Sequence, residues 1–538
     1  MVRCRIGFVV LASGLIWMVA PAGAQEGKPA RVEVITGHHG RTPPLWSYVR
    51  QMHAKPNAPF RVIPLFKPLR GKPGGGTWTD PDLENGTSGP LQAKAGVAFE
   101  GATADGYVPP DPNISVSPDT DAHPHGQIVE TTNVTYAVYD KTGKTLLAPT
   151  AMHTIWAGGL PSSDLCATTD GGDPIVLWDQ VDQKWIISQL AYNSSFSSNE
   201  WCMAVSTTSD ALGSYDVYSY AFGSSFPDYP KVAVWQESSG TYSGIYFSAN
   251  IFSHGNSFAG ADFCGLPLAN SGYSLDKMTC IQDSSAASVL PADLEGTRPA
   301  PSGSPEMYLD FSGSNTLELY RFSFDAAAEA NTSLSAPEDL TVGMFHEACG
   351  GGVCVPQKGT KEQLDSLGDR LMYRLSYRNY GNGNDDLLVN QSAQVSSASN
   401  QTGVRWYEIA NPTTNPTIAQ QSTYSPDTSL YRWMGSIAQD HAGDLGLGFS
   451  TSSSSAYPGL AFTGQQASDS ANTMEAEMPI YVGGGAQTKA NRWGDYSSVS
   501  IDPTDDCTFW YVNEYLLKNG TYTNWATYIA SFKFSTCR

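Results

Sequence analysis

The sequence has few charged residues, and the basic ones are scarcer than the acidic ones. Of its 538 residues, only 15% are Asp, Glu, Lys or Arg, and 31 basic residues stand against 52 acidic ones, which gives a formal net charge of −21. A surface this negative repels nucleic acid and anionic membranes, because both carry negative charge. We therefore expect neither a nucleic-acid-binding protein nor one that inserts into a membrane.

Several motifs of established chemistry are also missing. The chain contains no G-x-S-x-G, no H-E-x-x-H and no P-loop, so nothing supports a serine hydrolase, a zincin or a nucleotide-dependent enzyme. No CxxC pair occurs, and no histidine stands at ligand spacing from a cysteine, which argues against a cysteine-based metal site. The sequence predicts no cofactor.

One short stretch leaves a metal ion open. His123 and His125 lie two residues apart in DAHPHGQ, where they could ligate a metal, act in catalysis or simply belong to a loop. Asp119 and Asp121 nearby could help to hold Ca²⁺, although the full spacing of an EF-hand loop is absent. We interpret the histidines as loop residues and predict no metal ligands.

Long apolar runs are missing except at the start of the chain. Arg3 and Arg5 precede the apolar run Ile6–Val19, and Ala22-Gly23-Ala24 forms a small-x-small cleavage site. This pattern is typical of a secretory signal peptide spanning residues 1–24, and an uncleaved anchor is the alternative. The mature protein should be secreted and soluble, in the extracellular space or a periplasm.

Cysteines are few but even in number once the signal is removed. Nine occur in the sequence, and Cys4 lies in the signal. Eight remain in a chain expected to be exported, which predicts disulfides. Eight cysteines allow 105 pairings. Proximity in sequence and expected hairpin neighbours favour the one that joins Cys166–Cys202, Cys264–Cys280, Cys349–Cys354 and Cys507–Cys537.

Helical patterns are almost absent, whereas Ser, Thr, Asn, Gly and aromatic residues are abundant, which predicts an all-β protein. Residues 25–105 are rich in Pro, Gly and Asn with little periodicity, and we expect an irregular N-terminal arm or pro-segment there. From residue 106 to residue 538 the sequence becomes rhythmic. Short apolar strands alternate with Asp- or Gly-rich turns and aromatic strands, the pattern of successive β-hairpins.

Hairpin patterns begin clearly near Asp173, Tyr229, Ser436 and Ser497, and more loosely near Asp111, Glu306 and Asp369. Seven such units, each apparently of four strands, predict a β-propeller with seven four-stranded blades. A pair of β-sandwiches is the structural alternative. The first strand of each blade should line the central channel, so residues just before these strands should lie at the channel mouth.

The predicted blade-entry positions are rich in Asp and Arg. Each arginine offers a planar donor fork suited to carboxylate, sulfate or phosphate, and paired carboxylates suit glycoside cleavage. The same residues could instead pair with one another and seal the channel. The candidate catalytic residues are Asp173, Asp228 and Asp495, and the candidate substrate-binding residues are Arg370, Arg432, Arg492, Asp111, Tyr229 and Tyr496.

A phrase that opens with Arg-Trp occurs twice near the end of the chain. It starts at Arg432 and at Arg492, and each copy continues into an apolar strand and an Asp-x-x-x-Asp element. We predict that both arginines point to the channel mouth. Trp433 and Trp493 should then pack between blades, because neighbours in a strand face opposite sides. The Asp-x-x-x-Asp elements should cap the first hairpin turns.

The chain resembles a known family in several phrases, which are VPPDPNISV, GDPIVLWD, FPDYPKVAVW, LPADLEG, DRLMYRLSYRNYG, RWMGSIAQD, STSSSSAYPG and RWGDYSSVSIDPTDDCTFWYVNEY. They look like a group of large secreted bacterial β-propeller proteins of the sialidase-like or BNR type. The resemblance implies a substrate carboxylate bound by three arginines, a role that Arg370, Arg432 and Arg492 would imitate. The chain lacks the S-x-D-x-G-x-T-W Asp-box and the Arg-Ile-Pro start of sialidases.

These observations lead to one functional hypothesis and two alternatives. The leading hypothesis is a secreted propeller that acts, like a glycoside hydrolase, on an extracellular anionic glycan at the channel mouth. A non-catalytic propeller that binds glycan or protein at the same mouth is the first alternative, and a surface scaffold is the second. Whether the protein is an enzyme at all, and its oligomeric state, are left open by the sequence.

Overall fold

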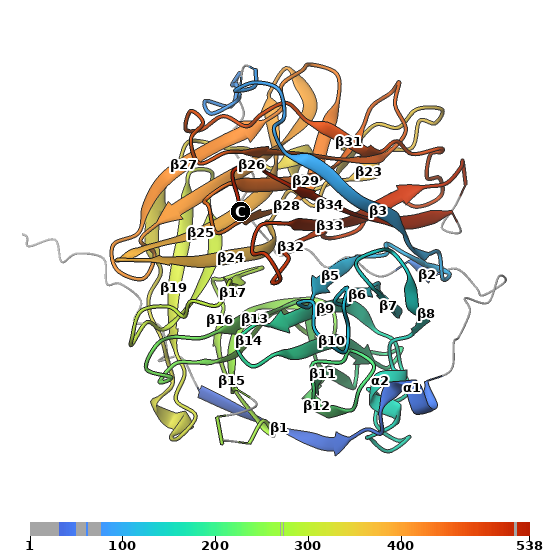
Figure 1. Ribbon diagram of the computed structural model, residues 1–538, viewed down its shortest axis with the longest axis vertical. Coiled ribbons are helices and arrows are strands. Elements are labelled where there is room, and N and C mark those ends of the chain that lie inside the picture. Colours follow the sequence, from blue (N-terminus) through green and yellow to red (C-terminus); the bar gives the residue numbers. More distant parts are fainter. Residues whose placement is uncertain are drawn as a thin grey trace, which may run out of the picture.

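The structure is a computed structural model of the whole chain, and it describes residues 32–49, 61–62, 77–84, 86–268, 271–272, 274–520 and 524–538 (Figure 1). The predicted signal peptide lies outside these residues. Strands dominate, and the described helices are two single turns, α1 (Leu45–Tyr48) and α2 (Thr154–Ala157), and two 3-10 turns, η1 (Glu329–Asn331) and η2 (Ala348–Gly350). Within the described part of the chain, every helix is too short to cross a bilayer.

Most described strands pair with their sequence neighbours in seven successive antiparallel runs. The first three runs are β5 (Asn113–Val116), β6 (Ile128–Thr131), β7 (Thr135–Tyr139) and β8 (Thr145–Ala151); β9 (Gly172–Asp179), β10 (Lys184–Tyr192), β11 (Asn199–Ser206) and β12 (Tyr215–Gly223); and β13 (Ser225–Trp235), β14 (Gly244–Ser253), β15 (Ser257–Pro267) and β16 (Lys277–Asp283).

The fourth run has two short outer strands that both pair with its third strand. The remaining runs are β17 (Leu290–Glu295), β18 (Glu306–Ser312), β19 (Thr316–Ser323), β20 (Ser333–Leu334) and β21 (Glu338–Thr341); β24 (Leu371–Gly381), β25 (Asn384–Ser396), β26 (Ser399–Ala410) and β27 (Thr417–Tyr424); β28 (Tyr431–Gln439), β29 (Leu445–Ser452), β30 (Gly459–Gln465) and β31 (Met478–Tyr481); and β32 (Ser498–Ile501), β33 (Phe509–Leu516), β34 (Trp525–Lys533) and β3 (Lys94–Thr103). Two further small pairs are β2 (Arg61–Val62) with β4 (Tyr107–Val108) and β22 (Val353–Val355) with β23 (Leu364–Asp365).

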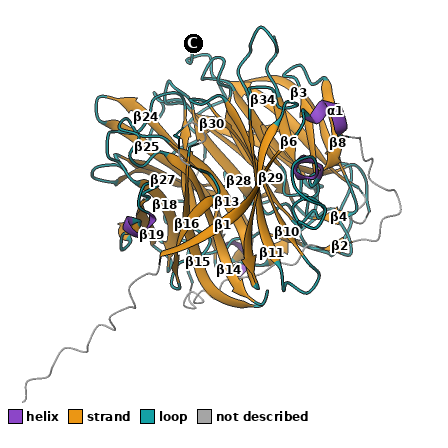
Figure 2. Cartoon of the chain, turned by 90° about the horizontal axis from the view of Figure 1, so that it is seen from below, coloured by secondary structure: helices purple, strands orange, loops and turns teal. Residues whose placement is uncertain are grey.

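The first strands of the runs form a closed cycle. Each of β5, β9, β13, β17, β24, β28 and β32 contacts the first strand of the next run, and β32 contacts β5. Sheets arranged radially around their first strands make a β-propeller, so the predicted all-β propeller is confirmed and the pair of sandwiches is not formed. Figure 2 shows a molecule built almost wholly of strands and loops. The count of seven blades stays a prediction that rests on these seven runs.

The N-terminal region contributes strands to the propeller, so the prediction that residues 25–105 are irregular throughout is wrong. β3 pairs antiparallel with β34, so that a strand from near the N-terminus completes the sheet formed by the C-terminus (Figure 1). β1 (Val32–Arg41) pairs with β12 through its second half and with β16 through its first half. Both strands cover sheet edges, which would otherwise expose unpaired backbone groups.

The predicted hairpins form, but one predicted unit starts at the wrong strand. Trp178 on β9 faces Trp185 on β10, as the alternation in this stretch predicts. The loose unit predicted near Glu306 starts one strand too late, because Glu306 begins β18 and the first strand of its run is β17. The short sequence LPADLE lacks the two-residue alternation of apolar and polar side chains, so its pattern does not predict a channel strand.

The hydrophobic core lies mainly between neighbouring runs. Trp201 of the second run contacts Phe247 of the third, with ring centroids 4.3 Å apart. Phe462 of the sixth run stacks on Phe532 of the seventh at 4.0 Å. Aromatic side chains of this kind bury large areas and hold adjacent sheets face to face.

All four predicted cysteine pairs are present as disulfides. Cys264–Cys280 joins paired strands β15 and β16. Cys507–Cys537 links the loop before β33 to the end of the chain, beyond β34. This last bond fastens the run in which strands from the two ends of the chain meet.

Candidate functional site

Three consecutive runs begin with the same local backbone. Asp111, Asp173 and Tyr229 each precede a proline, and their φ angles are +46°, +51° and +54°. A residue other than glycine rarely adopts this left-handed conformation, and a following proline restricts the backbone further. Such strain persists where the surrounding structure imposes it, and it is common at functional sites.

A chain of hydrogen bonds connects these strained entries around the channel. One carboxylate oxygen of Asp111 accepts the backbone N–H of Asp495 at 2.6 Å, and the other accepts the side-chain amide of Asn133 at 2.7 Å. Asn133 in turn accepts the backbone N–H of Asp173 at 2.8 Å. Asp173 accepts the backbone N–H of Tyr229 at 3.1 Å. The entries of the seventh, first, second and third runs are thereby joined.

Three cations lie among these carboxylates. Arg492 donates one amino group to both oxygens of Asp495, each at 2.7 Å. Arg370 donates to Asp369 at 3.0 Å, and its guanidinium carbon lies 4.5 Å from the ring centroid of Tyr229. Arginine is suited to such contacts because its flat fork both donates hydrogen bonds and stacks on rings.

Lys231 is the third cation. Its Nζ lies 3.5 Å from the ring centroid of Tyr229 and 4.1 Å from that of Tyr496, and it donates to the carbonyl of Pro230 at 2.9 Å. Burial lowers the pKa of Lys231 to about 7, while the nearby Asp173, Asp495 and Asp111 act to raise it. An amine with such a pKa can gain or lose a proton near neutral pH.

We call this group the entry cluster. Every member is buried, with at most 8% of its surface exposed. The members are Asp111, Asp173, Asp228, Tyr229, Lys231, Asp369, Arg370, Arg492, Asp495 and Tyr496. Five carboxyl groups face three cations here, and an enclosed cluster favours protonation of the excess carboxyl groups, because burying an unpaired charge is costly.

The carboxyl groups of the cluster have different surroundings. Burial raises the pKa of Asp228 well above its usual range, and the charge of the nearby Asp173 raises it further. Burial likewise raises the pKa of Asp173 and of Asp111. The carboxyl group of Asp228 forms no hydrogen bond or ion pair with the described residues, and its exposed fraction of 8% is the largest in the cluster. It is the carboxyl group most available to a bound molecule.

Arg432 is the sequence-predicted site residue that the structure places apart from the others. Its guanidinium donates to Glu477 at 2.7 Å and also binds Asp427, and it lies over the ring of Tyr424. Arg432 thus pairs with Asp427 and Glu477 and Arg492 with Asp495, whereas the sequence predicts both guanidinium groups at one channel mouth. The two copies of the Arg-Trp phrase therefore have different surroundings. The β27–β28 loop and the segment before β31 supply the acidic side chains that bind Arg432.

The two tryptophans of the repeated phrase behave as predicted. Trp433 and Trp493 are fully buried, with ring centroids 5.7 Å apart, and Trp493 donates its indole N–H to Ser450 at 3.0 Å. The predicted turn caps also form: Asp440 accepts the backbone N–H of Ala442 and of Asp444, at 2.9 and 3.0 Å. The same holds for Asp502, which accepts from Thr504.

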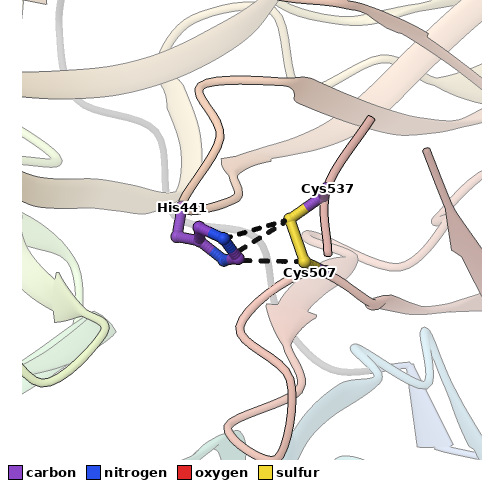
Figure 3. Close-up of side chains that lie close together, drawn as sticks. All are labelled: His441, Cys507 and Cys537. Carbon is purple, nitrogen blue, oxygen red and sulfur yellow. Dashed lines mark hydrogen bonds between the residues drawn. A yellow bond between two sulfur atoms is a disulfide. The ribbon is translucent and has the colours of Figure 1, made fainter. Parts of the chain in front are cut away.

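The histidine stretch lies in a loop, as interpreted from the sequence. His123 is 3.5 Å from Asp210, and Asp119 is bound by Lys141 at 2.9 Å. Among the described residues, three groups of His, Cys, Asp and Glu are close enough to hold a metal ion, and each contains disulfide-bonded cysteines. In one of them the ring of His441 lies against the Cys507–Cys537 disulfide (Figure 3). Sulfur in a disulfide is not the thiolate that binds a metal.

Sequence reasoning missed Lys231 and assigned no separate role to Asp369. A signal for Lys231 exists, because it is the one charged residue in the apolar stretch YPKVAVW. A lysine in a channel strand needs partners, and these come from Tyr496 and Asp495, which lie far away in the sequence.

Comparisons with known proteins add only weak similarities. No family model matches the chain, and no curated protein does either. Among solved structures, an alpha-L-arabinanase of Penicillium chrysogenum is 8% identical with a TM-score of 0.33, over 86% of this chain and 100% of that one. An alpha-L-arabinofuranosidase of Fusarium graminearum is 8% identical with a TM-score of 0.34, over 86% and 99% of the two chains. The WD40 domain of SCAP from fission yeast is 10% identical with a TM-score of 0.32, over 79% and 86%. No activity of this chain follows from similarities of this size.

Proposed function

We propose that the protein is a secreted glycoside hydrolase-like propeller that acts on an extracellular, anionic glycan at the entry cluster. The observation that carries the proposal is the cluster itself, in which carboxyl groups of raised pKa stand beside three cations and two tyrosine rings. Paired carboxyl groups with separate roles are what glycoside cleavage needs. The four disulfides support a protein of an oxidising compartment.

In this proposal Asp228 is the general acid. A carboxyl group can donate a proton to a leaving oxygen near neutral pH only if its pKa is raised. Burial does this for Asp228, and the absence of hydrogen bonds to described residues leaves its proton available. Asp173, whose charge acts on Asp228, is the second carboxyl group and serves as the base.

The other members of the cluster position the substrate and these two groups. Arg492 holds the carboxylate of Asp495, and Asp495 is in turn fixed by Asp111 through its backbone N–H. Arg370 and Arg492 supply the positive charge that an anionic sugar requires. Tyr229 and Tyr496 supply aromatic surface next to Lys231.

A non-catalytic glycan- or protein-binding propeller is the second candidate. The enclosure of the cluster argues against catalysis there, because no member has more than 8% of its surface exposed. Charged groups this well enclosed can also seal the channel by pairing with one another, as the bond between Arg492 and Asp495 shows.

Screening the purified protein against a panel of neutral and anionic polysaccharides tests the proposal. Reducing-sugar release should be found on an anionic member of the panel, and Asp228→Asn should lower the rate by about 10²- to 10⁴-fold, the usual contribution of a general acid. Asp276→Asn, at an exposed carboxyl group on another surface, is the matched control and should retain the rate. Binding without product release would replace hydrolysis with the second candidate, and neither binding nor release would contradict both.

A further inference from the structure

A cavity of about 550 Å³ lies at the end of the channel strands opposite to the entry cluster. Its lining comes from the ends of β17 and β24 and from the turns that follow β28 and β32. These are first strands of four consecutive runs, so the cavity opens where the channel ends. Its volume lies in the range of about 300–1,000 Å³ that is usual for small-molecule sites. We call it the exit cavity.

The acidic groups of the exit cavity are already bound by arginines. Arg378 donates to both oxygens of Asp506, at 2.9 and 2.8 Å, and its Nε donates to the carbonyl of Gln439. Glu295, at the end of β17, is bound by Arg374, which also holds Asp293 deeper in the channel. Both lining carboxyl groups thus have an arginine partner, although Arg374 is shared between Glu295 and Asp293, and burial raises the pKa of Glu295 to about 7.

Arg298 is different. It lines the cavity and is exposed, and it makes no hydrogen bond or ion pair with the described residues. One amino group of its guanidinium lies next to Gly381, where an added Cβ would be only 2.9 Å away. A permanently charged, planar fork without an acid partner is therefore held on the wall of a cavity.

The backbone of the exit cavity keeps this space open. Gly296 has a φ of +75°, and an added Cβ would lie 2.9 Å from Arg378 and 3.5 Å from Asp506. Gly381, with a φ of +83°, leaves the same kind of space for Arg298. Two glycines in the left-handed conformation thus leave room for the guanidinium groups of Arg378 and Arg298.

Neutral polar groups and one histidine complete the lining. The side-chain amide of Asn379 donates to the carbonyl of Pro299, and the hydroxyl of Tyr380 donates to the carbonyl of Asp440, so both are fixed in place. His441 contacts the Cys507–Cys537 disulfide (Figure 3) and the carbonyl of Asp506. Asp506 directly precedes Cys507, so this wall of the cavity lies next to a covalent cross-link.

We propose that the exit cavity binds a sugar-sized organic anion, with Arg298 holding its carboxylate or sulfate group. The fork of Arg298 matches a planar carboxylate through two parallel hydrogen bonds, which a neutral sugar cannot replace. The cavity is larger than a bare inorganic ion requires, which favours a ligand with a ring body. This site is separate from the entry cluster, and it does not depend on the proposed hydrolysis.

Isothermal titration of the full chain with D-glucuronate, glucose 6-sulfate and glucose tests the proposal. Glucuronate or glucose 6-sulfate should bind, and glucose should not, because it lacks the anionic group. Preference between the two anions distinguishes a carboxylate ligand from a sulfated one. Arg298→Ala should weaken anion binding about 10- to 100-fold, the expected effect of losing hydrogen bonds to a charged group. Arg298→Lys should lose less, because it keeps the charge but not the fork.

One control separates this site from others. Arg321→Ala removes an arginine that pairs with Glu338 outside the cavity, and it should leave binding unchanged. Equal binding of glucuronate by the wild type and Arg298→Ala, equal binding of glucose, or no binding of either anion would overturn the proposal.

Discussion

The two ends of the channel strands differ in how their charged side chains are paired and enclosed. At the entry end, ten residues that include five carboxyl groups and three cations are enclosed together, with at most 8% exposure. At the exit end, Arg378 binds Asp506, Arg374 binds Glu295, and a cavity of about 550 Å³ remains beside Arg298, which pairs with none of the described residues. Excess negative charge is buried at one end, whereas a positive charge is left accessible at the other.

The difference indicates what each end can do. Enclosed carboxyl groups that compete for few cations acquire raised pKa values, which suits proton transfer. At the exit end Glu295 and Asp506 each have an arginine partner, and the accessible cation is Arg298. A protein with a formal charge of −21 thus retains a local site at which an anion is attracted.

Removing Arg492 should have the largest effect on stability at the entry end. Arg492 is 4% exposed and binds both oxygens of Asp495, so Arg492→Ala leaves a buried carboxylate without its partner. We expect a loss of roughly 3–5 kcal/mol in the free energy of unfolding. Chemical denaturation measures it, and Arg298→Ala at the exit end should cost little. Equal losses in the two variants would remove the contrast between the ends.

Trp493→Ala tests the packing that accompanies the arginine. The side chain is fully buried against Trp433, so truncation should cost about 3–5 kcal/mol. Trp46, which is 69% exposed, provides the control, and Trp46→Ala should stay within about 0.5 kcal/mol of the wild type. Thermal and chemical unfolding of both variants check the pair. A small loss for Trp493→Ala would mean that the repeated phrase is not needed for packing.

Two of the disulfides should differ in how much they stabilise the folded protein. Cys507–Cys537 closes a loop with a sequence separation of 30, whereas Cys349–Cys354 spans 5. In the chain-entropy model the first contributes about 3–4 kcal/mol and the second about 2 kcal/mol. Double Cys→Ser variants of each pair, compared by urea denaturation, should show this order. The reverse order would argue against a role of Cys507–Cys537 in closing the ring.

Glu514, near the entry cluster, should make the free energy of unfolding depend on pH. Burial raises the pKa of Glu514 to about 8 from an ordinary 4.5, and its carboxyl group accepts the backbone N–H of Gly494. Because the folded pKa is raised, the folded protein binds more protons between pH 4.5 and 8, and this contribution to stability is lost as pH rises through that window. Glu514→Gln should remove up to about 1.4 kcal/mol per pH unit of this slope. Parallel stability curves for the two proteins would contradict the raised pKa.

Much of the entry end could be predicted from the sequence. Asp111, Asp173 and Asp228 stand directly before apolar strands and near prolines, and the position before a channel strand fixes where a side chain goes. Arg432 satisfied the same rule and was still misplaced, because Asp427 and Glu477 bind it. Which acidic side chain an arginine binds depends on the positions of loops, and the sequence pattern does not predict those positions.

Other features depend on pairing across the whole chain. β3 looked irregular because its partner, β34, lies at the opposite end of the sequence, so its pattern has meaning only after the ring closes. The burial of Lys231 is explained by the ring of Tyr496 beside it, and Tyr496 lies far away in the sequence. The exit cavity is built from four separate turns, and no local pattern of residues describes a space between them.

Measuring hydrolysis and anion binding side by side in Asp228→Asn and Arg298→Ala tests most directly whether the two ends have separate functions. The account predicts that Asp228→Asn loses release of reducing sugar and still binds D-glucuronate as the wild type does. It predicts that Arg298→Ala keeps hydrolysis and loses glucuronate binding by about 10- to 100-fold. Loss of both properties in either variant, or hydrolysis unchanged in Asp228→Asn, would contradict the division of labour between the entry cluster and the exit cavity.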